Sequence, residues 1–514
     1  MSETKTFSLR NRIGLFGAIP LFLFLLHFPI SDTLQPLAQK TLAVAALMAW
    51  LWISEALPIP VTSLIPAIAF PLLHIMDGNR VFQSYSDSNI FLFMGGFFIA
   101  MAMQKWELHK RIALHIVRFI GLGPKKIVLG FMAATAFLSM WISNTAATMM
   151  MYPIGLAVIL QITQHSSENG PEIPEKSVKN FQTVLMLGIA YASSVGGIGT
   201  VIGTPPNIVL VSAMKSIFPD SPEIGFLRWM MVGVPIVLIF VPVAWFFLTS
   251  IVYPIRIKSL QSSSSVIQEE LEKMGPMSKG ERMVLIIFVL TALMWIFRQD
   301  LVLGTFVIPG WSNALGIEKM VNDGTVAIFS ALLLFAIPED LKSNSFLLDW
   351  EWARKIPWGI LLLFGGGIVL AEGIKTTGLS AWIGNNLTLL SEVPLFVMIM
   401  IVCFILTFLT EVTSNTATAL IFMPIMAATA VAMETHPLLF MFPAAISASC
   451  AFMLPVATPP NAIVFASGHI TIPQMAKAGV WLNFLGIITV TAVTYWLLAP
   501  VFGIALKILP EWAR

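Results

Sequence analysis

Charged side chains are scarce in this chain. Lys, Arg, Asp and Glu together make up 11% of its 514 residues, whereas 57% are hydrophobic. Such a composition excludes an ordinary soluble globular protein and indicates a chain embedded in a lipid bilayer. The formal net charge is only +2, so the charge balance indicates neither a nucleic acid nor an acidic macromolecule as a partner.

Residues typical of disulfide and metal chemistry are also few. The two cysteines, Cys403 and Cys450, lie in apolar segments, and the seven histidines show no His-x-x-x-His spacing. This pattern excludes a disulfide framework and argues against a zinc site. Ser467-Gly468-His469 resembles part of a hydrolytic site, but no third member accompanies it, and a turn at a helix end is the better interpretation. We therefore expect neither an enzyme nor an organic cofactor.

Long apolar stretches dominate what is present. Stretches of roughly 20 residues span a bilayer as helices, and we count about eleven of them, plus two hairpin-like segments that enter and leave on one face. The first stretch, 13–28, follows Lys5, Arg10 and Arg12 and shares features with a secretory signal, but a first membrane helix is the simpler interpretation. The Lys and Arg residues between segments predict a cytoplasmic N-terminus and a C-terminus outside.

Two short motifs occur twice and in the same order. Ser-Asn-Thr occupies 143–145 and 414–416, an offset of 271 residues (414 − 143), and Thr-Pro-Pro-Asn occupies 204–207 and 458–461, an offset of 254 (458 − 204). The polar loop 164–180 has a much shorter counterpart in the second half and absorbs the difference. A duplicated unit is therefore indicated.

The two halves are predicted to enter the membrane from opposite sides. The segment before the first Ser-Asn-Thr hairpin, 90–104, runs inward, whereas the segment before the second, 358–375, runs outward. Inverted repeats with interrupted helices are typical of secondary transporters, whose substrate and ion sites lie near the bilayer midplane.

The duplicated motifs carry groups suited to an anion and to cations. Ser-Asn-Thr is a good N-cap sequence for the helix that follows it, and Thr-Pro-Pro breaks a helix and restarts it. The N-termini of half-helices favour an anion, exposed carbonyl oxygens favour an alkali cation, and the amides of Asn144 and Asn415 can serve both. Small polar residues at helix interfaces are the alternative for each motif taken singly.

These motifs, together with Met94-Gly95-Gly96 and the stretch 105–111, resemble the divalent anion:sodium symporter family of dicarboxylate, citrate and sulfate carriers. The resemblance covers nearly the whole chain. It implies an all-α polytopic membrane protein with two re-entrant helical hairpins in an inverted repeat, sodium as the coupling ion, a homodimer and an elevator-type movement. We expect a C4-dicarboxylate such as succinate, malate or fumarate as the substrate. A sulfate transporter and a sodium-independent dicarboxylate or 2-oxoglutarate exchanger stay as alternatives.

The resemblance also implies ligand sets. The first sodium ion would bind Ser139, Ser143, Asn144 and the backbone of Gly203, and the second would bind Thr410, Asn415 and the backbone carbonyls of Thr413 and Ala457. The substrate would contact Asn144, Thr145, Thr204, Ser414, Asn415, Thr416, Thr458 and Pro459.

Four ionisable residues, Glu55, Glu372, Lys375 and Glu411, lie at or near the ends of apolar segments. Only Glu411 adjoins a motif. It is a candidate for holding the second hairpin tip through hydrogen bonds.

The expected organisation has five parts, in a bacterial inner membrane. They are N-terminal scaffold helices (1–85), a first inverted repeat (86–255) with hairpin 127–162 and broken helix 181–213, a cytoplasmic linker (256–282), further scaffold helices (283–349), and a second inverted repeat (350–514) with hairpin 394–433 and broken helix 439–468. An ion channel could use similar hairpins, but a duplicated site within one chain favours alternating access.

Overall fold

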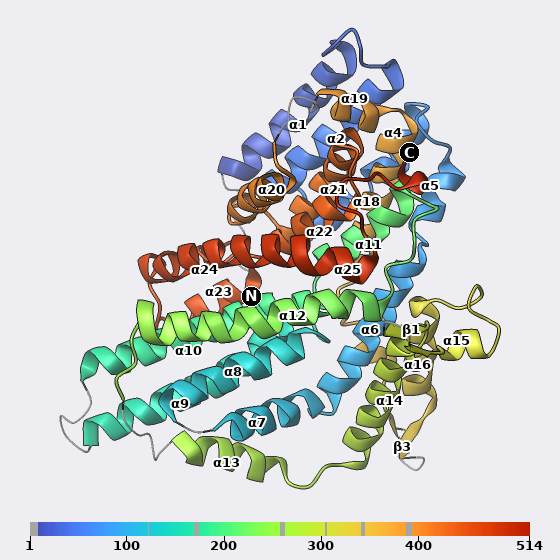
Figure 1. The fold of residues 1–514 in the computed structure, drawn as a ribbon. Coiled ribbons are helices and arrows are strands. Elements are labelled where there is room, and N and C mark those ends of the chain that lie inside the picture. The colour runs from blue at the N-terminus through green and yellow to red at the C-terminus, as the bar shows by residue number, and fades with distance from the viewer. Residues whose placement is uncertain are drawn as a thin grey trace.

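The computed structural model describes residues 9–121, 123–168, 174–257, 263–303, 306–340, 345–386 and 393–514. Within these ranges the chain is mainly helical (Figure 1). Nine helical segments of the described part are long and apolar enough to cross a membrane, and four shorter apolar segments of 10–17 residues accompany them. The expected class, a helical integral membrane protein, is confirmed.

The N-terminal part begins with two long helices and then becomes irregular. Residues 59–72 form two short helices, because Pro60 and Pro66 lie in the first turns of separate helices rather than inside one. The elements are α1 (Leu9–His27), α2 (Pro36–Ser54), α3 (Ile59–Thr62), α4 (Ile65–Leu72), α5 (Gly78–Ser84), α6 (Ser88–Lys105) and the amphipathic α7 (Leu108–Ile120).

In the first repeat, two helices form a hairpin and the helix after them is interrupted. The hairpin is α8 (Pro124–Ser139) and α9 (Asn144–Glu168), and the broken helix is α10 (Glu175–Gly196), the 3₁₀ turn η1 (Gly197–Gly199) and α11 (Pro205–Ile217). The long α12 (Phe226–Phe246) follows and ends in the π-helical turn η2 (Phe247–Val252).

The middle of the chain contains elements that the sequence did not predict. The predicted linker 256–282 contains a helix, α13 (Ser263–Met274), while its residues 258–262 lie outside the described part. Two β-hairpins of antiparallel strands also occur, with Leu301 opposite Ile308 in the first. The elements are α14 (Lys279–Ile296), β1 (Leu301–Leu303), β2 (Phe306–Ile308), α15 (Trp311–Ala314), α16 (Asp323–Ala336), β3 (Pro338–Asp340), β4 (Ser345–Phe346) and α17 (Trp350–Ala353).

The second repeat follows the same plan as the first. Its hairpin is α20 (Leu395–Thr410) and α21 (Asn415–Ala432), and its broken helix is α22 (Leu438–Ser447) and α23 (Pro459–Phe465). The flanking elements are α18 (Trp358–Thr376), α19 (Leu379–Asn386), α24 (Ile472–Val493), the π-helical η4 (Thr494–Leu498), α25 (Ala499–Phe502) and η5 (Glu511–Ala513).

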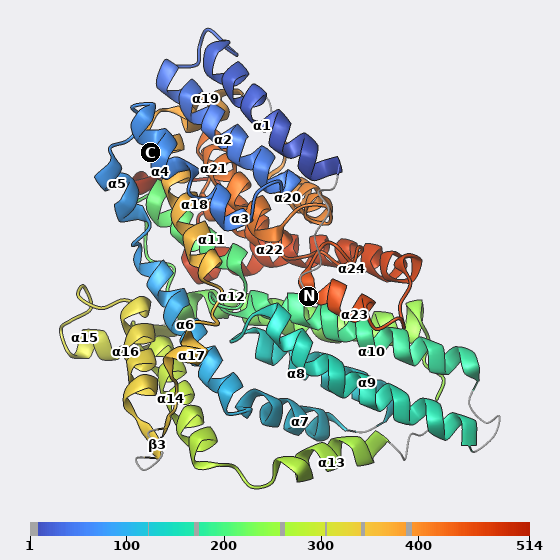
Figure 2. The same cartoon turned by 180° about the vertical axis from the view of Figure 1, so that it is seen from behind.

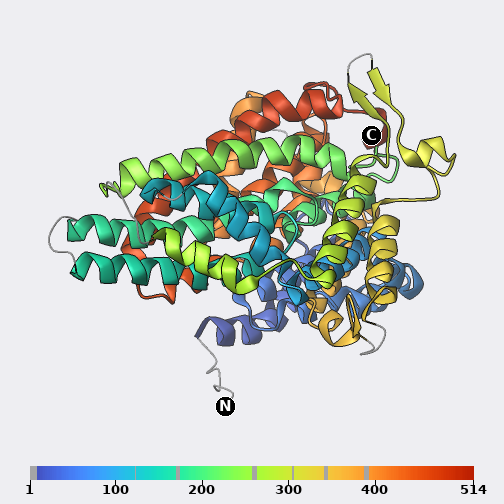
Figure 3. The same ribbon diagram turned by 90° about the horizontal axis from the view of Figure 1, so that it is seen from below.

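The two repeats pack crosswise. Helix α11, which starts at the first Thr-Pro-Pro-Asn, packs against α21 of the second hairpin, whereas α23, which starts at the second, packs against α9 of the first hairpin and against α10. Figures 1 and 2 show α8, α9, α10, α12 and α24 lying side by side, with α6, α14 and α16 grouped to one side. Seen from below, the ends of α9 and α10 project at one end of the molecule and the strands with α15 lie at the other (Figure 3).

Candidate functional site

The two hairpin tips are built alike. Ser139, the last residue of α8, donates its hydroxyl to Oδ1 of Asn144 at 2.6 Å, and Thr410, the last residue of α20, donates to Oδ1 of Asn415 at 2.7 Å. Both donors lie five residues before their asparagine, so the bonds are repeat equivalents. Each bond fixes the amide at the start of the next helix and joins two members of a predicted sodium-ligand set.

The unwound segment between η1 and α11 brings a third ligand to the first tip. A Cβ atom on Gly197 would lie 2.5 Å from Oδ1 of Asn144, 3.0 Å from the carbonyl oxygen of Gly203 and 3.1 Å from Cβ of Thr204. The Asn144 amide, the Gly203 carbonyl and Thr204 therefore surround one point. Oxygen donors supplied by an unwound backbone and by small polar side chains suit an alkali cation.

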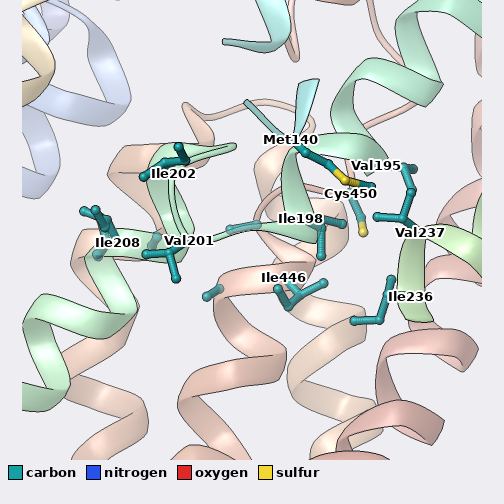
Figure 4. Packing of buried hydrophobic residues seen from close by; sticks show 14 of the residues in the cluster. Met140, Val195, Ile198, Val201, Ile202, Ile208, Ile236, Val237, Ile446 and Cys450 are labelled. Carbon is teal, nitrogen blue, oxygen red and sulfur yellow. The ribbon is translucent and has the colours of Figure 1, made fainter. Parts of the chain in front are cut away.

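Apolar side chains fix the unwound segment from the other side. Figure 4 shows Ile198, Val201 and Ile202 from this segment, with Ile208 of α11 and Ile236 of α12 among their neighbours. Burying these side chains stabilises an irregular backbone that would otherwise be costly to hold in one conformation.

Further hydrogen bonds tie the first broken helix to the first hairpin. The Ser193 hydroxyl donates to the carbonyl of Asn144 at 2.7 Å, and the Thr200 hydroxyl donates to the carbonyl of Met140. In the second repeat, the carbonyl of Ala448 lies 2.9 Å from the Thr410 hydroxyl and shares its single proton with Oδ1 of Asn415. Hairpin and broken helix are thus joined within each repeat.

Only half of the predicted N-caps use their side chains. Ser143 accepts the N–H of Ala146 at 3.3 Å, and Thr458 accepts the N–H of Asn461 at 3.3 Å. Thr204 and Ser414 occupy N-cap positions without a side-chain cap hydrogen bond. Helix α21 therefore keeps N–H groups available for a ligand at its N-terminus, whereas in α11 Pro205 and Pro206 have no N–H and the N–H of Asn207 bonds to the carbonyl of Thr204 at 3.2 Å.

Glu411 provides a contact that the first repeat lacks. Its buried carboxylate accepts the backbone N–H groups of Phe452, Met453 and Leu454 at 2.7 to 3.2 Å, and the amide of Asn483 at 2.8 Å. The sequence predicted that Glu411 holds the hairpin tip. The structure shows that it fastens the tip to the unwound segment of the second broken helix.

Asn483 is a residue that the sequence analysis missed. It is a fully buried polar residue within the apolar helix α24. A polar side chain in such a segment is a signal for a specific partner, and this signal was available.

The remaining predicted ligands make fewer hydrogen bonds to one another. Among the described residues, no side-chain hydrogen bond links Thr145, Ser414 or Thr416 to another predicted ligand. The tip triplets 143–145 and 414–416 are all partly exposed, whereas Thr204, Thr458 and the residues beneath them are buried. Both tips therefore keep polar groups within reach of a ligand. Pro459 is exposed in the first turn of α23, and the Thr413 hydroxyl bonds inward to the carbonyl of Leu409.

Two of the four ionisable residues flagged from the sequence, Glu55 and Glu372, form ion pairs. Arg10 pairs with Glu55 at 2.9 Å, and Arg80 pairs with Glu372 at 2.5 Å. Ser467 accepts the N–H of His469 at 3.2 Å in the turn after α23, as expected of a helix-end turn.

Comparisons with known proteins identify the family of the chain. A family model described as "Sodium:sulfate symporter transmembrane region" matches residues 10–502. The sequence is 42% identical over 503 residues to a sodium-dependent dicarboxylate transporter, SdcS, of Staphylococcus saprophyticus, and 44% identical over 503 residues to the protein of the same name from Staphylococcus aureus. Each alignment covers 98% of this chain and 94% of the relative.

Solved structures show a related fold. The YdaH transporter of Alcanivorax borkumensis superimposes with a TM-score of 0.57 at 12% identity, covering 82% of this chain and 89% of that one. MtrF of Neisseria gonorrhoeae gives a TM-score of 0.53 at 15% identity, covering 93% and 97%.

Proposed function

The chain belongs to the sodium:sulfate symporter family, and from that premise we propose that it couples inward sodium movement to the uptake of a C4-dicarboxylate such as succinate, malate or fumarate. The sodium-dependent dicarboxylate transporters that are 42% and 44% identical to it support this assignment. The observation that carries it is the duplicated tip, in which Ser139 with Asn144 and Thr410 with Asn415 present matching oxygen donors.

The proposed cation sites follow from the two tips. Ser139, Ser143, Asn144 and the Gly203 carbonyl hold one sodium ion. A second set, formed by Thr410, Asn415 and the carbonyls of Thr413 and Ala457, holds the other. The convergence of Asn144 and Gly203 on one point supports the first set.

The proposed dianion site uses neutral groups. Its members are Asn144, Thr145, Thr204, Ser414, Asn415, Thr416, Thr458 and Pro459, which begin helices α9, α11, α21 and α23 or precede them. Helix N-termini stabilise negative charge through their free N–H groups, so no buried arginine is required. The uncapped start of α21, whose first turn contains no proline, supports this role.

The charge of the substrate explains why sodium is needed. Moving a dianion into a negative-inside cell costs about 4.6 kcal/mol per 100 mV, twice the value of about 2.3 for a single charge. Two sodium ions cancel this charge, and a third makes transport electrogenic.

We assign the movement to alternating access of elevator type in a homodimer within a bacterial plasma membrane, with the N-terminus cytoplasmic and the C-terminus outside. The repeats 86–255 and 350–514 carry the site, and 1–85 and 283–349 form the scaffold. The crosswise packing of α11 with α21 and of α23 with α9 supports treating the site-bearing segments as one unit.

Uptake into proteoliposomes tests the proposal. Wild-type protein should accumulate radiolabelled succinate only with an inward sodium gradient, and Asn144→Ala and Asn415→Ala should each abolish accumulation. Uptake indifferent to sodium would instead assign a dicarboxylate exchanger. Uptake of sulfate in place of succinate would transfer the assignment to sulfate, and loss in only one of the two variants would contradict a symmetric site.

A further inference from the structure

The last residue of each Thr-Pro-Pro-Asn motif has no place in the ligand sets proposed above. Asn207 and Asn461 are both fully buried, at 0% exposure, in the first turns of α11 and α23. Burying an amide at this depth is costly unless it makes specific hydrogen bonds. Both amides make such bonds, and they make them to the unwound segment that precedes their own helix.

In the first repeat, Nδ2 of Asn207 donates to the carbonyl of Gly197 at 2.9 Å and to the carbonyl of Thr200 at 2.7 Å. The Thr200 carbonyl also accepts the N–H of Gly203 at 3.3 Å. The asparagine therefore fixes the acceptor that holds Gly203, whose own carbonyl is a proposed sodium ligand.

The second repeat reproduces this arrangement in the same register. Nδ2 of Asn461 donates to the carbonyl of Ala451 at 3.2 Å and to that of Leu454 at 3.0 Å, and the Leu454 carbonyl accepts the N–H of Ala457 at 3.2 Å. Ala457 supplies the corresponding carbonyl of the second sodium set. The arrangement is kept although alanines stand where the first repeat has glycines at 197 and 203.

We propose that Asn207 and Asn461 are positioning residues for the two sodium sites. Each amide holds the carbonyl that receives the N–H of residue 203 or 457, and so sets the direction in which that residue presents its carbonyl oxygen to the ion. On the other side, residue 203 or 457 joins a threonine that is restricted to extended backbone by the following proline. The ligating residue is thus fixed from both ends before sodium arrives, which lowers the entropy lost on binding. This inference rests on the proposed sodium-coupled function.

The asparagines act only through their amide hydrogens. Among the described residues, Oδ1 of Asn207 and Oδ1 of Asn461 have no hydrogen-bond donor. Aspartate has nearly the same shape but no hydrogens to give, and it would set a carboxylate against two carbonyl oxygens. Asn→Asp is therefore the sharpest substitution, and Asn→Ala removes the donors without adding charge.

The test measures the sodium concentration for half-maximal succinate uptake in proteoliposomes, together with the maximal rate at saturating sodium. For Asn207→Ala and Asn461→Ala we expect the half-maximal sodium concentration to rise about tenfold, which corresponds to the loss of roughly one well-placed hydrogen bond. The maximal rate should stay within about twofold of wild type. Asn207→Asp and Asn461→Asp should raise the half-maximal sodium concentration further. Asn386→Asp, at the exposed end of α19 where the amide donates to the carbonyl of Trp382, is the matched control and should change neither value.

Binding without transport gives a second measurement. Sodium should raise the unfolding temperature of wild-type protein in detergent, and this sodium-dependent increment should shrink in the Ala variants while their sodium-free unfolding temperature changes less. A merely structural role would lower the sodium-free value and leave the increment intact. If wild-type uptake depends on sodium and the variants keep the wild-type half-maximal concentration, the positioning role is wrong and the proposed function stands. If wild-type uptake ignores sodium, the proposed function itself is wrong.

Discussion

At the scale of single residues, the two halves of the site hold their unwound segments by different means. In the first repeat the backbone closes on itself, with Gly197 and Gly203 so near each other that a Cβ on Gly203 would lie within van der Waals overlap of the Gly197 carbonyl. In the second repeat alanines occupy these positions and the carboxylate of Glu411 holds the segment through three backbone N–H groups. Close backbone packing therefore holds the unwound segment of the first repeat, and the carboxylate of Glu411 holds that of the second.

The first half should therefore not tolerate a methyl group at Gly197. A Cβ there would lie 2.5 Å from Oδ1 of Asn144, so Gly197→Ala must displace a proposed sodium ligand, at a cost of about 1–3 kcal/mol. We expect at least a several-fold loss of sodium-driven succinate uptake at equal protein content, measured in proteoliposomes. Gly78→Ala is the control, because the nearest atom to its Cβ would be 3.9 Å away. Unchanged uptake by Gly197→Ala would refute the crowding at this point.

The stability of the second repeat should depend on the charge of Glu411. In Glu411→Gln, one of the two acceptor oxygens becomes an NH₂ group facing backbone N–H donors, and we expect a loss of about 1–3 kcal/mol in stability. The measurement is the unfolding temperature in detergent, with and without sodium. Glu318→Gln, at an exposed position between α15 and α16, should leave both values unchanged. An unfolding temperature equal to wild type in Glu411→Gln would show that the carboxylate contributes no stability.

At the scale of elements, the repeated plan of hairpin and broken helix has local signals in the sequence, because Ser-Asn-Thr and Thr-Pro-Pro mark helix starts by their local chemistry. Hairpin 127–162 and broken helix 181–213 correspond to α8 with α9 and α10 with α11. Contacts between distant segments could not be read in this way. The bond between Glu411 and Asn483 spans 72 residues and leaves no periodic signal, and the strands near 301–308 are too short to show alternation. The roles of Asn207 and Asn461 depend on backbone geometry that composition does not encode.

The amphipathic helix α7 is tied to the start of α14 by a buried ion pair. Nε of Arg111 donates to Glu281 at 2.7 Å, and Ser278 and Glu281 form a capping box. Burial opposes ionisation of Glu281, but the hydrogen bonds from Arg111 and Ser278 outweigh it and hold the pKa of this carboxyl below its ordinary value. A carboxyl with a lowered pKa in the folded protein stabilises the fold above the ordinary carboxyl pKa of about 4.3, and this stability is lost as the pH falls through the lowered value.

We therefore expect Glu281→Gln to lower the unfolding temperature in detergent at pH 7, by the equivalent of about 3–5 kcal/mol for a broken buried pair. The difference from wild type should begin to shrink below about pH 4.3 and be smallest once the pH has fallen through the lowered pKa of Glu281, where the wild-type carboxyl is also neutral. Glu175→Gln, which removes an exposed partner of Lys179, is the control and should have no measurable effect. A difference that does not vary with pH would show that the charge of Glu281 is not responsible.

At the scale of the whole molecule, the buried pair of Arg298 and Asp323, together with the exposed Glu223, connects the first repeat to the helices predicted as scaffold. Arg298, which follows α14, pairs with Asp323 at the start of α16 and with Glu223 in the loop between α11 and α12. The other oxygen of Asp323 accepts the N–H of Phe226 at the start of α12. If the repeats move against the scaffold during transport, these are contacts that must break and re-form.

Removing both members of the pair should cost less stability than the sum of removing each one alone. Arg298→Ala leaves the buried Asp323 without its cation and should reduce stability by about 3–5 kcal/mol, whereas Arg298→Ala with Asp323→Ala should lose less than the sum of the single losses. Unfolding temperatures of the four proteins give the coupling, and succinate uptake rates of the same variants show whether these ion pairs limit transport. Additive losses would show that Arg298 and Asp323 do not depend on each other.

Because α11 packs against α21 and α23 packs against α9, each half of the protein forms part of the surface against which the other half packs. Each proposed sodium set comes from one repeat, whereas the proposed dianion set draws on both, so the two repeats do not act as independent units. A substitution at one tip therefore changes the surroundings of the opposite tip. The two halves can differ in sequence, as they do at Gly197 and Glu411, only where both tips keep their function.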